Sequence, residues 1–343
     1  MNEKTVNVAV IAEGINEEYQ NTILNGIHEY SSKHNINISH FIAYGGVLKN
    51  KKYDVGEFNI YNLVNLSKFD GIILLINTIP TSAVTDEILK KVKEAGIPAV
   101  LLDNDKKDFY HIGIDNFTAM EEMVRHIVEH HKAKKINYIS GPIGNPESQL
   151  RLKAYKTVLE QNGIPIEEER IYHGPHFRGE DGRDAVNVFL NSELEFPDAI
   201  ICANDAMALS AVIELEKFGK DVPDDVLITG FDCIYAAQNY SPKISSVNRP
   251  LKNSGYLACQ LINEKINGIE NERSHIFATE CIFAESCGCH DYNSEDIALF
   301  RKNNYKTLET YDIYVPMVNR MSCELEECQT FEESRSVGKR SPS

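Results

Sequence analysis

Short apolar runs alternate with stretches of helical periodicity along the first 245 residues of the chain. The runs that we predict to be strands are 6–11, 37–43, 71–76, 99–102, 111–114, 136–139, 170–172, 199–202 and 227–229. The intervening stretches repeat apolar residues every three or four positions, as helices do. Short, continuously apolar strands separated by helices predict parallel sheets covered on both faces. Two successive rounds of this pattern predict an α/β fold of two lobes, each a doubly wound parallel sheet flanked by helices.

Composition adds limits to this picture. The chain has 343 residues, of which 42% are hydrophobic, so it is long enough for two lobes and an extension. Its formal charge of −16 argues against a nucleic-acid surface, which needs clustered positive charge. No apolar run approaches the roughly 20 residues of a membrane span, and no secretory signal opens the chain. We therefore expect a cytoplasmic protein that contacts neither membrane nor nucleic acid directly.

Polar residues follow several of the predicted strands. They include Glu13, Asn116, Asn204 and Asp232, and Arg151 lies near the start of a predicted helix. In doubly wound sheets, ligands bind at the carboxyl ends of the strands. Asn and Asp side chains bind hydroxyl groups, and Arg binds a carboxylate or two adjacent hydroxyls. Taken singly, each residue is more typical of a helix N-cap or a turn.

In order along the chain, these motifs resemble the ligand-binding core of the lactose-repressor family, which has the type 1 periplasmic-binding-protein fold. The segments that carry the resemblance are 110–116, 148–155, 197–208, 222–232 and 242–247. The resemblance covers about residues 5 to 285 and implies a ligand cleft between the lobes. The residues that correspond by position to cleft residues of the family are Glu13, Asn116, Arg151, Asn204, Asp232 and Arg249. Because the chain has no tryptophan, we expect stacking on a ligand ring to fall to a Phe or Tyr such as Tyr19, Phe231 or Tyr235.

The predicted division places a two-lobed sensor in residues 1–285. Its first lobe comprises 5–115 and 247–270, and its second lobe comprises 116–246 and 271–285. Residues 286–333 repeat apolar positions near a heptad spacing, which predicts a helix that pairs with a second copy or carries a signal. A helix that folds back on the sensor is the alternative. Residues 334–343 have no core-forming pattern and are predicted to be disordered.

The eight cysteines are scattered, and without an export signal we expect free thiols. Cys287, Cys289 and His290 supply at most three ligands to a metal, and no second cluster follows them. His126 and His130 share a helical face but have no third ligand nearby in the sequence. We therefore expect structural thiols and an exposed pair of histidines, with no metal and no cofactor. A metal site or a redox switch at the thiols is the alternative.

The chain shows no nucleophile elbow, phosphate-binding glycine loop or catalytic carboxylate pair, so we do not expect an enzyme. Repressors that it resembles carry about 60 residues of DNA-binding structure before the sensor, whereas here the first strand starts at residue 6. We therefore expect a homodimeric input domain that senses a small polar metabolite, such as those preceding diguanylate cyclases in bacterial signalling proteins. The ligand remains open between a polyol, a sugar above all, and a carboxylate. A DNA-binding regulator without its head and a transporter's solute-binding protein are the alternatives.

Overall fold

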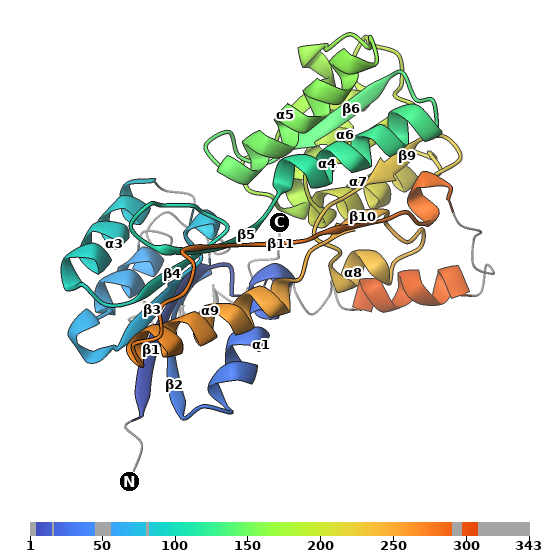
Figure 1. Ribbon diagram of the computed structural model, residues 1–343. Helices are drawn as coiled ribbons and strands as arrows, with labels where there is room; N and C mark the ends of the chain where they lie inside the picture. The colour runs from blue at the N-terminus through green and yellow to red at the C-terminus, as the bar shows by residue number, and fades with distance from the viewer. Residues whose placement is uncertain (1–4, 16, 45–55, 80–81, 290–296, 308–343) are drawn as a thin grey trace, which may run out of the picture.

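The computed structural model describes residues 5–15, 17–44, 56–79, 82–289 and 297–307. The described chain forms two lobes, each built on its own parallel sheet with helices on both faces (Figure 1). The predicted α/β fold class is thereby confirmed. Within the described residues, no helix is long and apolar enough to cross a membrane.

The first lobe contains a six-stranded sheet in the order β11-β5-β4-β3-β1-β2, with every pair parallel. Its strands are β1 (Val6–Glu13), β2 (Ile36–Ala43), β3 (Gly71–Leu74), β4 (Ala99–Leu102), β5 (Tyr110–Ile114) and β11 (Ser274–Phe277). Helices α1 (Glu18–Ser31) and α9 (Leu251–Ile266) cover one face, and α3 (Ser82–Ala95) covers the other. Because side chains alternate along a strand, Val8 and Val10 pack under α1 and α9, whereas Ala9 and Ile11 face α3.

The second lobe contains a four-stranded parallel sheet in the order β7-β6-β8-β9. Its strands are β6 (Ile136–Ser140), β7 (Ile171–His173), β8 (Ala199–Cys202) and β9 (Leu227–Thr229). Its helices are α4 (Asn116–Arg125), α5 (Pro146–Gln161), α6 (Gly179–Leu190), α7 (Asp205–Lys217) and α8 (Tyr235–Gln238). One apolar cluster runs through this lobe and includes buried residues from each of these helices.

Three segments connect the lobes. The first joins β5 to α4, the second leads from β10 (Ser246–Asn248) into α9, and the third leads from β11 to β12 (Glu280–Ile282). Strands β10 and β12 pair antiparallel beside the second lobe. The predicted boundary at residue 270 placed 274–277 in the second lobe, which is wrong because β11 pairs with β5 at the edge of the first sheet.

Residues 297–307 are helical and lie against the second lobe. Lys302 Nζ is 2.7 Å from Glu216 Oε1, and the Tyr305 ring meets Tyr240 edge to face at 5.4 Å. Arg301 pairs with Glu285 at 3.4 Å. This part of the predicted signalling segment therefore packs on the sensor. Residues 290–296 and 308–333 of that segment and the predicted tail, 334–343, lie outside the described residues.

Candidate ligand-binding cleft

A cavity of about 470 Å³ lies between the lobes and is lined by residues of both. Six of the eight residues predicted to hold a ligand line it: Glu13, Tyr19, Arg151, Asn204, Asp232 and Arg249. Asn116 and Phe231 are buried behind this layer. The convergence follows from topology, because the carboxyl ends of parallel strands meet at one edge of each sheet. That these residues bind a ligand remains a prediction.

Arg151 projects from α5 and is 2% exposed. Its Nε donates to Asn116 Oδ1 at 2.8 Å, and its Nη1 donates to the Ala203 carbonyl at 2.7 Å. The guanidinium carbon lies 3.7 Å from the centroid of the Phe231 ring. Asn116 and Phe231 therefore orient Arg151, and Phe231 is not placed to stack on a ligand.

Arg249 lies on the second lobe-connecting segment and contacts carboxylates of both lobes. Its Nη2 is 2.5 Å from Asp103 Oδ1 of the first lobe. Its Nη1 is 3.1 Å from Glu147 Oε1 and 3.2 Å from Asp232 Oδ1, both of the second lobe. Tyr19 completes the group, since its hydroxyl donates to Asp103 and its ring lies beside Arg249. Arg249 therefore joins the two walls of the cavity.

Asp103 and Glu147 were missed by sequence reasoning, although signals for both exist. Asp103 directly follows β4, where the rule that located Glu13 also applies, and it has a left-handed backbone with φ of 56°. Glu147 lies one helical turn before Arg151 and accepts from Arg151 Nη2 at 3.2 Å. Phe177, which lines the cavity in a loop and also has positive φ, gave no comparable signal.

The cleft contains more buried carboxylates than cations. Burial raises the pKa of Asp103 to about 6 in spite of the nearby Arg249. Burial likewise raises the pKa of Asp232, against the opposing effect of both guanidinium groups. Burial also opposes ionisation of Glu147, but Arg249 and Arg151 outweigh it and hold its pKa below the ordinary value. Both guanidinium groups are thus neutralised by protein carboxylates.

Glu13 has an incomplete set of partners. Burial raises its pKa to about 7, because the Arg178 guanidinium, 3.8 Å from Oε1, offsets only part of the desolvation. Among the residues that the structure describes, no hydrogen-bond donor reaches Glu13 Oε2. The same holds for Oε1 of Gln20, which also lines the cavity and whose amide nitrogen donates to the Glu13 carbonyl at 2.8 Å. Two residues that line this cavity therefore each have a buried acceptor without a donor.

The lobes contact each other across the cavity. Arg178 of the second lobe lies 3.8 Å from Glu17 as well as from Glu13 of the first. Glu18 accepts from the backbone N–H groups of Tyr235 and Ala236 at the start of α8. Besides the connecting segments, these polar contacts beside the cavity therefore help to set the relative position of the lobes.

Two sheets wound in the same sense around an interlobe cavity define a type 1 periplasmic-binding-protein-like fold, and the comparisons with known proteins agree. Residues 124–287 match a periplasmic binding protein-like domain. The HTH-type transcriptional regulator RegA of Clostridium acetobutylicum is 28% identical over 292 residues, 83% of each chain. A complex of the transcriptional regulator CelR with cellobiose has a TM-score of 0.71 at 23% identity, covering 83% of this chain and 85% of the other. The lac repressor dimer bound to operator and an anti-inducer has a TM-score of 0.69 at 17% identity, covering 83% and 95%.

The two structures establish the fold alone, whereas the domain match and RegA agree with the expected resemblance to the ligand-binding domain of lactose-repressor-family regulators. The expected link to a diguanylate cyclase receives no support, since these relatives are named as regulators of transcription. The expected exclusion of nucleic acid conflicts with the same relatives, so net acidic charge was a poor basis for it. None of the three is named as an enzyme, in agreement with the expectation of a non-catalytic protein.

Proposed function

We propose that the cleft binds a neutral polyhydroxylated metabolite of the sugar class, and that binding changes the relative position of the lobes to control transcription. The carrying observation is that Glu13 and Gln20, which line the cavity, each have a buried side-chain oxygen, Oε2 and Oε1, that no donor reaches. A buried acceptor without a donor costs about 1–3 kcal/mol, which a ligand hydroxyl would recover. Cellobiose in the CelR complex, a neutral sugar, agrees with this proposal.

Charge favours a polyol over a carboxylate, the two ligand classes that the sequence left open. Arg151 and Arg249 already contact Glu147, Asp232 and, for Arg249, Asp103. An anionic ligand would have to displace one of these carboxylates or lie beside them in a site that excludes water. Hydroxyl groups instead donate to carboxylates and accept from guanidinium groups, so they suit both kinds of partner at once.

Calorimetry with matched pairs of sugars and sugar acids tests the ligand class. We expect a neutral hexose, pentose or disaccharide to bind at least about fivefold more tightly than its uronic or aldonic acid, which corresponds to the cost of about 1–3 kcal/mol for a buried unpaired group. Glu13→Gln should weaken that binding, whereas Glu94→Gln, at an exposed position on α3, should leave it unchanged. Tighter binding of the acid than of its neutral partner would reject the sugar assignment.

Transcriptional control is the second part of the proposal, and the named relatives support it. Selection of genomic DNA fragments with the natural full-length protein, with and without ligand, tests it. We expect a homodimer by light scattering and enrichment of a two-fold symmetric site whose occupancy changes with ligand. If the protein bound ligand but enriched no DNA site with or without it, the proposal of ligand binding would stand and that of transcriptional control would be rejected.

A further inference from the structure

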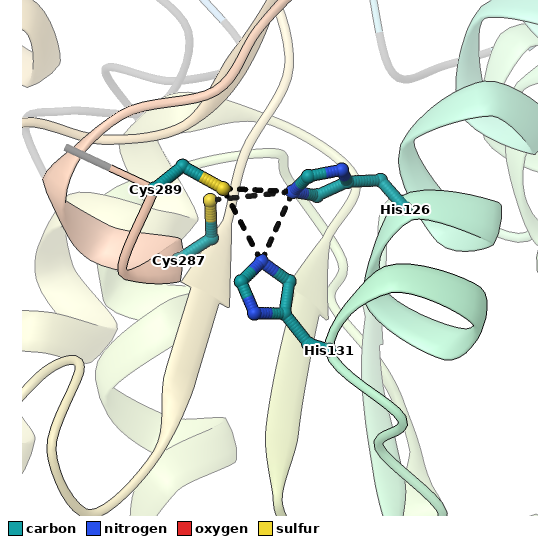
Figure 2. Close-up of side chains that lie close together, drawn as sticks. All are labelled: His126, His131, Cys287 and Cys289. Carbon is teal, nitrogen blue, oxygen red and sulfur yellow. Dashed lines mark hydrogen bonds between the residues drawn. The ribbon is translucent and has the colours of Figure 1, made fainter.

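Four potential metal ligands converge at the end of the second lobe that lies away from the cleft. They are His126 and His131, which follow α4, and Cys287 and Cys289, which follow β12 (Figure 2). Their four donor atoms all lie within 4.8 Å of one another. The two pairs are about 160 residues apart in the sequence, so the fold itself brings them together.

Four of the distances between these donor atoms are close to those between ligands of one tetrahedral ion. His126 Nε2 is 3.0 Å from His131 Nε2, 3.1 Å from Cys289 Sγ and 3.7 Å from Cys287 Sγ, and Cys289 Sγ is 3.3 Å from His131 Nε2. Zn–N and Zn–S bonds of about 2.1 and 2.3 Å imply ligand separations of roughly 3.3 to 3.8 Å around a tetrahedron. The four atoms need only small shifts to share one ion.

A π-helical turn makes this convergence feasible. In an α-helix of 3.6 residues per turn, residues five apart point about 140° away from each other. Residues His126–His130 instead form a π-helix, and the backbone N–H of His131 donates to the His126 carbonyl. Residues five apart then lie one above the other, and turns of this kind are frequent at functional sites. Our sequence interpretation paired His126 with His130 and therefore missed His131.

The surroundings suit a structural site. Cys287 is fully buried and the other three side chains are half-buried. The Phe283 ring stacks on the His126 imidazole at 3.6 Å, and His130 stacks near it at 4.9 Å, so the imidazole is held in position. Two thiolates and two neutral imidazoles would balance a divalent charge, as a water-poor site requires.

We propose that His126, His131, Cys287 and Cys289 form a structural Zn²⁺ site that fixes the segment after β12 to the end of α4. All four tetrahedral positions are filled by protein, so the ion would be structural and not catalytic. The sequence favoured thiols without metal, because the segment with Cys287 and Cys289 offers at most three ligands. This proposal is independent of the ligand in the cleft.

Metal analysis of the native chain tests it. We expect one equivalent of Zn²⁺ per chain after dialysis, and Co²⁺ added to the stripped protein should give the intense visible bands of a tetrahedral thiolate complex. His131→Ala and Cys289→Ser should each weaken Zn²⁺ binding by more than the roughly 10- to 100-fold typical of outer-shell changes. Circular dichroism of the half-buried His131→Ala variant separates lost metal from lost fold.

Two controls match the ligands. His40 is exposed on the first lobe, and its Nε2 atom is 3.0 Å from that of His28. Among the contacts described for these two histidines there is none with a cysteine. His40→Ala should therefore leave the zinc content unchanged, as should Cys281→Ser, which removes a nearby thiol outside the cluster. The proposal would be overturned if the native chain contained no zinc and the stripped protein gave no tetrahedral cobalt spectrum. Unchanged binding in His131→Ala, or a Cys287–Cys289 disulfide in protein purified under reducing conditions, would also overturn it.

Discussion

At the residue scale, the cleft is built around buried arginines whose charges are neutralised by carboxylates of the protein. Arg249 is 6% exposed and contacts three carboxylates that belong to both lobes. Arg273 offers a comparison, because it also lies 2.5 Å from an aspartate, Asp105, but on the surface. Because both arginines lie at the same distance from an aspartate but only Arg249 is buried, comparing them shows how burial changes the contribution of the ion pair to stability.

Replacing Arg249 should destabilise the protein strongly. Arg249→Ala leaves Asp103, Glu147 and Asp232 buried with too little positive charge, which typically costs about 3–5 kcal/mol. Arg273→Ala should cost less than about 1 kcal/mol, as exposed ion pairs do. Denaturant unfolding of both variants measures the difference. Equal losses would mean that the buried carboxylates relax by taking up protons or water.

Glu13 should make stability depend on pH. Its pKa is about 7 in the folded protein against 4.5 ordinarily, so between these values the folded state binds more protons than the unfolded state. The free energy of unfolding should therefore fall as pH rises from about 4.5 to about 7, by at most about 3 kcal/mol. Unfolding of the wild type and of Glu13→Gln across this range isolates the effect. Parallel pH profiles for the two proteins would contradict it.

How far the sequence predicts the site depends on how each residue is positioned. The ends of parallel strands converge by topology alone, so Glu13, Asn204 and Asp232 could be located from the order of strands and helices along the chain. Whether Phe231 faces a ligand or Arg151 depends on side-chain packing, which the pattern does not contain. The π-helical turn at His126 and the loop conformation of Phe177 are likewise set by tertiary contacts.

At the element scale, α1 and α9 pack backbone against backbone. A Cβ atom added to Gly26 would lie 1.9 Å from the Lys252 carbonyl oxygen, and one added to Gly255 would lie 1.9 Å from that of Ile23. The two glycines thus allow the helices to approach more closely than any side chain would permit. Because α9 follows directly from Arg249, this contact also positions a wall of the cleft.

A methyl group at this contact should separate the helices. Gly255→Ala should lower the free energy of unfolding by roughly 1–3 kcal/mol or more, the usual cost of overpacking. Gly56→Ala is the control, since a Cβ there meets nothing within 4 Å. Thermal unfolding of both variants tests this, and an unchanged Gly255→Ala protein would show that the helices can shift freely.

The pattern predicted most elements but not the edge of the first sheet. Strands buried on both faces, such as β3 and β4, are continuously apolar and could be recognised. Strand β11 is half-buried and contains His275, so its pairing with β5 rests on the path of the chain between lobes and not on hydrophobicity. The domain boundary failed there for this reason.

At the scale of the whole molecule, three connecting segments and a few polar contacts determine how the lobes sit. Removing Arg178, which spans the cavity mouth to Glu13 and Glu17, should favour open lobes. Arg178 is only partly exposed and Glu13 is buried, but both ion pairs are long at 3.8 Å, so we expect them to contribute about 1 kcal/mol. Ligand affinity should therefore fall by roughly two- to fivefold in Arg178→Ala. Small-angle scattering without ligand should give a larger radius of gyration for that variant.

Arg183 supplies the matched control for this change. It lies on α6 of the same lobe, half-exposed beside Asp184 of the same helix, and makes no ion pair with the first lobe among the described residues. Arg183→Ala should leave both ligand affinity and radius of gyration unchanged. A compact Arg178→Ala protein with native affinity would show that Arg178 does not help to set the lobe position.

The helix at 297–307 has a practical consequence for building a biosensor. Because it is packed on the second lobe through Lys302 and Tyr305, a fluorophore attached at its end would move as part of that lobe. An acceptor on α4 or α5 would then report almost nothing, however tightly ligand bound. An acceptor on α3 of the first lobe, near its end at Ala95, would convert lobe movement into a change of energy transfer. The useful labelling pair is therefore determined by the position of this one helix.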